Sequence, residues 1–429
     1  DLAAGASTAP TTTPPPPTPP TPTTPTSPTT TPPTTTPPPV PVTAPGQPPA
    51  ATLGVLEADP SLLAQDQQAG VRLATLNLSW AEWEPQNGVF NPGYRAAVLA
   101  KANAYRAAGW KVGVDLGLQQ PPAWALALPG GQLVDQNGRR SGVADFEFSQ
   151  AVRDAAAPFM VDVVRSMGPI DDFRVGLSQN GETYYPDVAN NGWWAFTPQA
   201  QGLAAGLPNG VGLDPMPGWV PGTRTWNGMP VTPPQVTAWY DWYFGALVNA
   251  HAWEIATYRS AGYTGQLELV MPGMGSLPAF YQQRLADDLA PGGEDSFSTL
   301  NSGAVWWRML NDLGPAALTN TAVDISSVYD NSGNPRGNAC QAADDSVNPS
   351  DSRIWGWSDT RWLAYLARSH NLPVMGENPG NTPASDLPGV MHLVAACHLT
   401  ALQWAWDFTL DRPGNPTRSQ LATAAANAS

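Results

Sequence analysis

From Thr52 onward the chain alternates short β-rich apolar runs with longer segments of helical period. We predict strands at residues 52–56, 72–80, 110–118, 172–180, 266–272, 322–328, 372–377 and 399–407. We predict helices at residues 60–70, 94–109, 148–168, 234–261, 278–290, 358–370, 385–396 and 416–427. Strands that alternate with helices form a parallel sheet, and eight such units close a (β/α)8, or TIM, barrel. The sequence therefore predicts an α/β fold of this type.

The segment before the first predicted strand has a different composition, because residues 10–49 consist largely of Pro and Thr. Such a segment has too little apolar side chain to offset the conformational entropy that folding would remove. We expect residues 1–50 to be a disordered Pro/Thr-rich linker and residues 51–429 to be a single (β/α)8-barrel domain.

The formal net charge is −15, and Lys101 and Lys111 are the only lysines, so phosphate backbones and anionic lipids find few partners. We predict no nucleic-acid partner. No stretch approaches the roughly 20 uninterrupted apolar residues that cross a bilayer, which predicts no membrane insertion. The chain opens at Asp1 without Met or a basic leader, and we interpret it as a processed, secreted or envelope-associated protein.

Cys340 and Cys397 are the only cysteines. In an oxidising compartment such a pair tends to be bridged, and the alternative is two separately buried thiols. The four histidines are scattered, and no metal-binding spacing, phosphate-binding glycine loop, serine elbow or dinucleotide fingerprint is present. We therefore predict neither a metal nor a cofactor.

Catalytic groups of a β/α barrel lie at the C-terminal ends of its strands, so carboxyl groups at those ends are the first candidates. They are Glu82 and Glu84 after the second predicted strand, Glu182 after the fourth and Glu377 at the end of the seventh. A surface or rim salt bridge is the alternative interpretation of Glu182 and of Glu377.

Glu182 has the strongest claim to a catalytic role. Gly181 permits a tight turn that would aim Glu182 into the barrel mouth, and Tyr184, Trp193 and Trp194 could form an apolar wall around it. An acid that protonates a glycosidic oxygen needs such surroundings, because they raise its pKa. We predict that Glu182 is the catalytic acid/base.

The domain resembles the retaining glycoside hydrolases that are built on β/α barrels, clan A, and locally the β-galactosidases of glycoside hydrolase family 42. LNLSWAEWEPQNGVFN at 76–91 and QPPAWALALPGGQLVDQNGRR at 120–140 carry the likeness. The resemblance implies an acid/base Glu after strand four, Glu182, and a nucleophile at the end of strand seven, Glu377. In that family the Asn that holds the sugar 2-hydroxyl directly precedes the acid, whereas here Gly181 separates Asn180 from Glu182. Asn180 is the matching residue, and we predict that it binds the substrate.

The strand-four segment VGLSQNGETYYP at 175–186 also resembles β-amylases, which invert configuration. An inverting enzyme activates water across a carboxyl gap of roughly 6.5 to 9.5 Å, whereas a retaining one places its nucleophile at roughly 5 to 5.5 Å. The sequence leaves both outcomes open.

Further substrate-binding residues are predicted from the same resemblance and from the 18 tryptophans. Tyr329 occupies the place after strand six where related enzymes hydrogen-bond the nucleophile, and Trp404 or Trp406 that of the tryptophan at the end of strand eight. Indole rings stack on sugars but also fill cores. The predicted substrate-binding tryptophans are Trp80, Trp124, Trp193, Trp194, Trp404 and Trp406.

The leading prediction is a secreted glycoside hydrolase acting on a polysaccharide or oligosaccharide by a retaining mechanism. The alternatives are an inverting, β-amylase-like α-glucan hydrolase and a non-catalytic polysaccharide-binding barrel. The linker resembles those that join secreted hydrolases to a carbohydrate-binding module or to the cell envelope. We expect the irregular insertion at 187–233 to shape the cleft.

Overall fold

The computed structural model describes residues 50–186, 192–289, 299–330 and 335–428. The predicted linker at 1–50 lies outside the described residues except for its last residue. The predicted insertion is described from residue 192 onward. The predicted helix at 278–290 is described up to residue 289.

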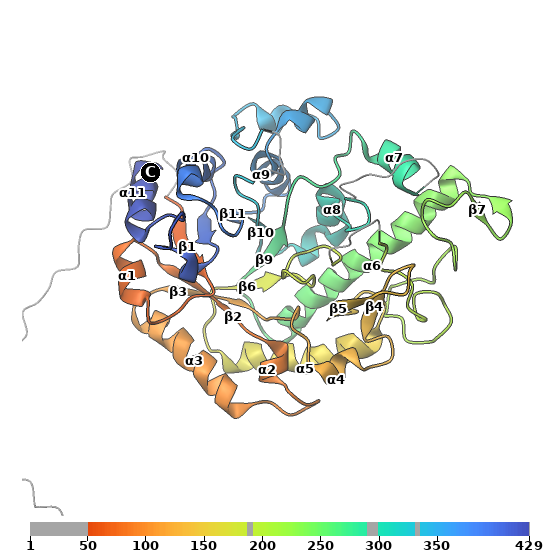
Figure 1. The fold of residues 1–429 in the computed structure, drawn as a ribbon, viewed down its shortest axis with the longest axis horizontal. Helices are drawn as coiled ribbons and strands as arrows, with labels where there is room; N and C mark the ends of the chain where they lie inside the picture. Colours follow the sequence, from red (N-terminus) through yellow and green to blue (C-terminus); the bar gives the residue numbers. More distant parts are fainter. Residues whose placement is uncertain (1–49, 187–191, 290–298, 331–334, 429) are drawn as a thin grey trace, which may run out of the picture. The chain divides into compact units, whose positions relative to one another are not determined.

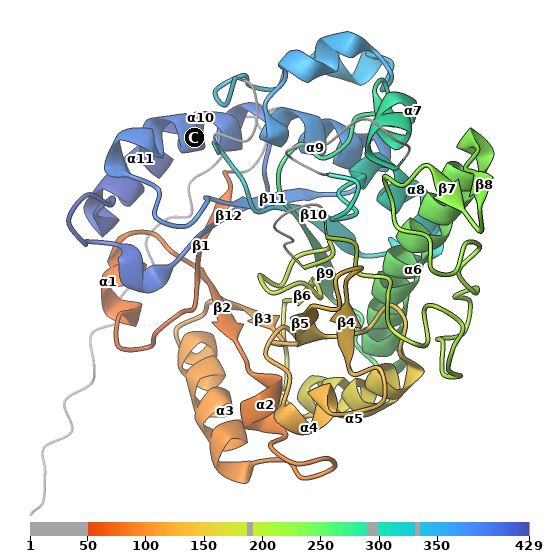
Figure 2. The same cartoon turned by 45° about the vertical axis from the view of Figure 1, so that its right-hand side comes forward.

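Eight parallel strands close into a barrel in the order β1-β12-β11-β10-β9-β6-β3-β2 (Figures 1 and 2). They are β1 Thr52–Leu56, β2 Leu73–Asn77, β3 Lys111–Asp115, β6 Asp172–Val175, β9 Gln266–Met271, β10 Thr321–Ile325, β11 Val374–Glu377 and β12 Ala401–Trp404. The register Thr52↔Ala401 to Val55↔Trp404 joins the first strand to the last. All eight predicted strands are confirmed, and so is the barrel.

Helices surround the barrel in both views (Figures 1 and 2). The longer ones are α1 Leu63–Gln68, α3 Pro92–Ala107, α5 Gln150–Ser166, α6 Pro233–Ser260, α8 Trp306–Ala317, α9 Asp359–Ser369, α10 Leu387–Ala396 and α11 Arg418–Ala428. The sequence prediction missed α8, in which Gly314 has a φ of 72° before Pro315, so the helical pattern is broken near its end. Within the predicted helix at 278–290, the structure shows α7 Tyr281–Arg284 and a π-helical turn at Leu285–Leu289.

The loops between the barrel strands contain short helices and hairpins. They are α2 Trp80–Trp83, α4 Ala123–Leu126, the hairpin β4 Gln132–Val134 with β5 Arg140–Ala144, and the hairpin β7 Thr225–Trp226 with β8 Met229–Pro230. Short 3-10 turns lie at Asp344–Ser346, Ser352–Gly356, Ala384–Asp386 and Asp407–Thr409. The described part of the insertion packs on α6, where Trp193 meets Trp239 and Tyr243 edge to face with ring centroids 5.4 Å apart. The insertion is thereby anchored to the barrel by aromatic packing.

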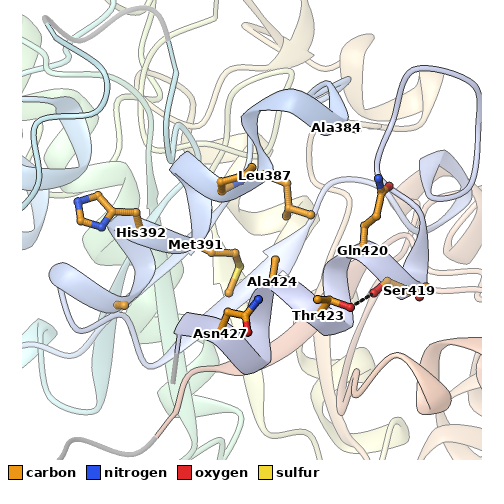
Figure 3. A pocket seen from close by; sticks show the side chains of 11 residues that line it. Ala384, Leu387, Met391, His392, Ser419, Gln420, Thr423, Ala424 and Asn427 are labelled. Carbon is orange, nitrogen blue, oxygen red and sulfur yellow. Dashed lines mark hydrogen bonds between the residues drawn. The ribbon is translucent and has the colours of Figure 1, made fainter.

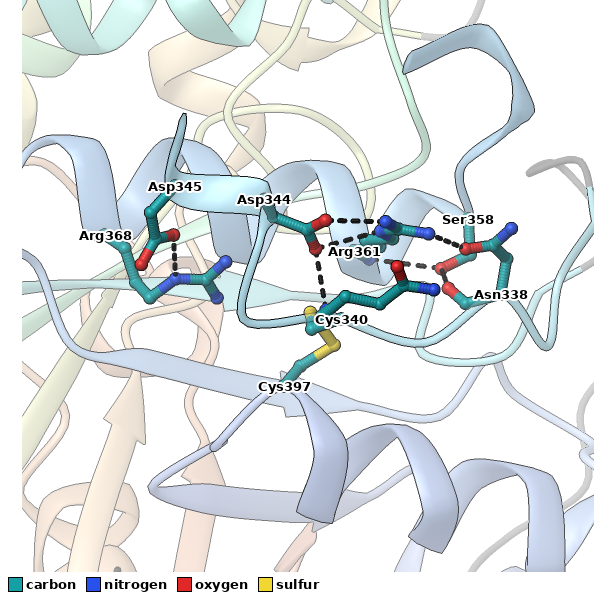
Figure 4. Close-up of a disulfide and its surroundings, with 9 residues drawn as sticks. Asn338, Cys340, Asp344, Asp345, Ser358, Arg361, Arg368 and Cys397 are labelled. Carbon is teal, nitrogen blue, oxygen red and sulfur yellow. Dashed lines mark hydrogen bonds and ion pairs between the residues drawn. A yellow bond between two sulfur atoms is a disulfide. The ribbon is translucent and has the colours of Figure 1, made fainter. Parts of the chain in front are cut away.

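A disulfide joins Cys340, in the segment after β10, to Cys397 at the end of α10 (Figure 4). The same segment is held against α9 by two ion pairs, Asp344 with Arg361 at 2.6 Å and Asp345 with Arg368 at 2.9 Å. The bridge predicted as one of two alternatives is therefore present.

We expect a double variant, Cys340→Ser with Cys397→Ser, to lower the free energy of unfolding. The bridge spans 57 residues. Closing a loop of that length lowers the conformational entropy of the unfolded chain, which stabilises the folded state by about 4 kcal/mol. Urea denaturation with and without a reductant measures the effect. An unchanged midpoint in the variant would contradict the expectation.

Candidate active site

Glu182 lies on a tight turn that follows β6. The backbone N–H groups of Leu177 and Ser178 both donate to the Glu182 carbonyl, at 3.1 and 3.2 Å. Gly181 has a φ of 69°, in the left-handed region that favours glycine. Position 176 has room only for glycine, because a Cβ there would lie 2.1 Å from the Gly181 carbonyl oxygen. The two glycines let the chain turn sharply just before Glu182.

Glu182 is only 8% exposed. Burial, with a further contribution from Glu377, raises its pKa to about 7 although hydrogen bonds from neighbouring side chains lower it. Ser326, just after β10, donates to Oε1 at 2.5 Å. Asn180 donates to the Tyr184 hydroxyl at 3.1 Å, and both side chains face the same carboxyl group. A carboxyl group in this setting can hold a proton near neutral pH.

Glu377 is the last residue of β11 and is also 8% exposed. Arg174 of β6 donates to both of its oxygens, with distances of 2.8 Å to Oε2 and 3.3 Å to Oε1. Asp324 of β10 lies 3.5 Å from the same guanidinium without a hydrogen bond of good geometry. Burial opposes the charge of Arg174, but Glu377 and Asp324 hold its pKa well above the ordinary value. This two-pronged bond places the positive charge of Arg174 against both carboxyl oxygens of Glu377.

We expect Arg174→Met to leave two buried carboxyl groups without a cation. Breaking a buried pair in this way typically costs about 3 to 5 kcal/mol of stability. Arg174→Lys keeps the charge but loses the forked geometry, and should recover stability better than turnover. Urea denaturation and kcat of both variants check this. A methionine variant as stable as the wild type would contradict the assigned pairing.

Further polar groups fill the barrel below Arg174. Glu268 of β9 accepts from Gln403 of β12 at 3.1 Å, and both side chains are fully buried. Burial and neighbouring carboxylates raise the pKa of Asp172 to about 7, and burial also raises that of Glu268. Asp324 and Glu268 therefore share the electrostatic attraction of the Arg174 guanidinium with Glu377.

Sequence reasoning overlooked Asp115, the last residue of β3. Its oxygens accept from the Gly117 N–H at 2.9 Å and from Gln119 at 3.1 Å. A Cβ on Gly181 would lie 3.0 Å from Asp115 Oδ2, so this carboxylate borders the Glu182 turn. Its electrostatic effect, second to burial, raises the pKa of Glu57, the residue after β1. The predicted strand at 110–118 placed Asp115 inside the strand, so the strand-end rule that selected Glu377 did not select it; the observed strand ends at Asp115.

Four of the predicted substrate-binding tryptophans are buried in the core: Trp80, Trp193, Trp194 and Trp404. Trp80 stacks on Phe159 with centroids 5.9 Å apart and donates to Glu84 at 2.9 Å. Glu84 also accepts from the Gly88 N–H at 2.7 Å, which accounts for both of its oxygens. Glu82 is exposed. The structure thus gives Trp80 and Glu84 packing and hydrogen-bonding roles beneath the second loop.

Trp124 and Trp406 remain half-buried and keep ring surface for a ligand. Trp406 lies parallel to Phe408 with centroids 5.8 Å apart, and Phe408 is 41% exposed. The Tyr329 ring lies under the Arg336 guanidinium at 4.6 Å and against Gly389, where a Cβ would lie 2.1 Å from it. Tyr329 therefore packs on α10, and its proposed link to Glu377 stays a prediction.

A cavity of about 630 Å³ lies between α10 and α11 (Figure 3). No carboxyl group lines it, so it lacks the acids that the barrel mouth offers. Within the described ranges, no group of three or more His, Cys, Asp or Glu side chains could hold a metal ion. None of the described helices is both long enough and apolar enough to cross a membrane.

No family model and no curated protein matches this sequence. Among solved structures, the catalytic domain of β-amylase from Paenibacillus polymyxa superposes with a TM-score of 0.55 at 13% identity, over 90% of this chain and 100% of that chain. A β-galactosidase from the Antarctic haloarchaeon Halorubrum lacusprofundi superposes with a TM-score of 0.50 at 14% identity, over 88% of this chain and 58% of that chain. Likeness at these identities shows the barrel fold.

Proposed function

We propose that this protein is a glycoside hydrolase in which Glu182 is the acid/base and Glu377 the nucleophile. One observation carries the proposal: two buried carboxyl groups of the same mouth have opposite environments. Burial raises the pKa of Glu182 to about 7, whereas Glu377 is held by the two-pronged bond from Arg174. One protonated and one ionised carboxyl group is the pair that glycosidic cleavage requires.

In the first step, the Glu182 proton passes to the glycosidic oxygen as the bond to the anomeric carbon breaks, and a Glu377 oxygen attacks that carbon. A covalent glycosyl ester on Glu377 results. In the second step, Glu182 takes a proton from water while the water oxygen attacks the anomeric carbon, which releases Glu377 and restores both carboxyl groups. Arg174 stabilises the charge on Glu377 before attack and after release.

An inverting mechanism is the second candidate. It is supported by the β-amylase motif around Glu182 and by the superposition on a β-amylase catalytic domain over 100% of that chain. There Glu377 would activate water in a single displacement. Following the product anomers by NMR during the first minutes of turnover separates the two, because net retention supports the leading mechanism and net inversion supports the second.

We expect kcat/KM to fall above pH about 7. Burial raises the pKa of Glu182 to about 7, and the free enzyme must carry that proton to donate it. A pH profile from 5 to 9, in steps of about half a unit, measures this limb. In Glu182→Ala, assayed with an activated leaving group, the limb should disappear. A basic limb unchanged by that substitution would assign the titration to another group.

Secretion is part of the proposal, supported by the Cys340–Cys397 bridge and by the Pro/Thr-rich N-terminal sequence. A carbohydrate-binding module or an envelope attachment upstream would suit such a linker. Galactosides, xylosides, arabinans and glucans are the candidate substrates. A panel of these glycans, with product length measured, tests the proposal, and binding without release of any sugar would favour a non-catalytic barrel.

A further inference from the structure

One face of α6 contacts the strand and turn that deliver Glu182. His251, Glu254 and Tyr258 lie on this face, since their spacing of three and four residues places them one above another. Tyr258 donates through its hydroxyl to the Arg174 carbonyl at 3.0 Å. Glu254 accepts from the Gly176 N–H at 3.3 Å. Polar side chains of one helix thus bind the backbone just before the acid turn.

The same face also reaches the far end of the turn. His251 Nδ1 lies 3.4 Å from Glu254 Oε2, and its ring faces the backbone of Thr183. Thr183 is fixed on its other side, where its N–H and hydroxyl both donate to the Val270 carbonyl, at 2.9 and 2.8 Å. The residues on either side of the segment that ends in Glu182 are therefore both braced by protein groups.

The side chains of His251 and Glu254 are almost fully buried. Burial raises the pKa of Glu254 well above its usual value and lowers that of His251 to about 3, so burial favours the neutral form of each side chain. A neutral carboxyl group donates through one oxygen and accepts through the other. In its neutral form Glu254 can donate through Oε2 to His251 Nδ1 while Oε1 accepts from the Gly176 N–H.

We infer that Glu254 and His251 are positioning residues that hold the Glu182 turn in its catalytic geometry. The inference rests on the proposed acid/base role of Glu182. Both side chains are almost fully buried, and their hydrogen bonds go to Gly176 and to each other, not to the Glu182 carboxyl group. They act through the backbone at Gly176 and Thr183, and a displacement of the acid by about 1 Å can cost on the order of 100-fold in rate.

The test compares Glu254→Leu with Glu254→Gln on two substrates that carry the same sugar, one with a poor alkyl leaving group and one with an activated dinitrophenyl leaving group. Glutamine keeps an acceptor for Gly176 and a donor for His251, so it should remain near wild-type. Leucine should lower kcat/KM by about 100-fold on the alkyl glycoside and by less than about threefold on the activated one. Only the alkyl glycoside depends on a well-placed acid.

Glu147→Leu is the matched control, because Glu147 is also a buried carboxyl group, burial raises its pKa to about 8, and it makes no hydrogen bond to the turn. It should affect both substrates equally. If Glu254→Leu does not fold, Glu254→Asp replaces it, since the shorter side chain cannot reach Gly176 and His251 together. It should show the same dependence on the leaving group.

The inference would be overturned if Glu254→Leu lowered kcat/KM equally on both substrates and Glu254→Gln did not restore it. Glu182→Ala is assayed alongside as the reference. If Glu182→Ala itself shows no dependence on the leaving group, the proposed function fails. If it shows that dependence and the Glu254 variants do not, only the positioning role fails.

Discussion

Glu377→Ala is expected to lose nearly all turnover, by a factor on the order of 10⁶, the scale seen when the nucleophile of another hydrolase is removed. The loss should be the same for poor and activated leaving groups, because both need a carboxylate at the anomeric carbon. Steady-state kinetics on matched glycosides measure it, and added azide should restore turnover by replacing the missing nucleophile.

Alanine also removes the partner of Arg174, so folding must be checked separately. Glu377→Gln keeps an oxygen for the guanidinium, and circular dichroism with urea denaturation of both variants gives the structural baseline. Asp344→Asn is a suitable control, because Asp344 is also a buried carboxylate and pairs with an arginine, Arg361 of α9. Turnover above about one tenth of the wild type in a folded Glu377→Ala would remove Glu377 from the chemistry.

Glu182→Ala is expected to lower kcat/KM by about 10² to 10⁴-fold on alkyl glycosides, the usual contribution of a positioned general acid. With an activated leaving group, the first step needs no proton, so the covalent intermediate forms and then accumulates. Azide should accelerate its breakdown, because the anion attacks without a base. A burst in pre-steady-state kinetics followed by a slow phase measures this behaviour.

A different pattern in this variant would change the assignment. Uniform loss on both leaving groups, without a burst or azide response, would point to a structural role of the Glu182 turn. Ser326→Ala serves as the companion variant, because Ser326 donates to Glu182 and lowers its pKa. In this variant the basic limb of the pH profile should move to higher pH. Without the Ser326 hydrogen bond the charged carboxylate is less stable, so the pKa of Glu182 rises.

The sequence predicted the barrel because β-rich runs and helical segments alternate eight times, and each predicted strand appears at its expected place. It also predicted Glu182 and Glu377 as strand-end carboxyl groups. Arg174 was not predicted, because no sequence motif marks an arginine inside a short strand. Its role depends on the residues that the other strands bring next to it. The α6 residues His251 and Glu254 were missed for the same reason, because only the folded chain brings them to Gly176.

Tryptophan content was a poorer guide than strand order. Trp80 and Trp404 adjoin or end strands, as a sugar-binding residue would, yet both are buried. Sequence alone does not say which side of a loop an indole faces, because core packing and sugar stacking favour the same side chain. Trp124 and Trp406 keep partial exposure, and their substrate contacts remain predictions.

Trapping the covalent intermediate tests the central assignment most directly. The protein is incubated with 2-deoxy-2-fluoro glycosides of galactose, glucose, xylose and arabinose that carry a good leaving group, and then digested for mass spectrometry. We predict one added glycosyl unit on the peptide that contains Glu377, and none in Glu377→Gln. Turnover of the parent substrate with inverted product and no labelled peptide, or a label on a different carboxyl group, would contradict the account.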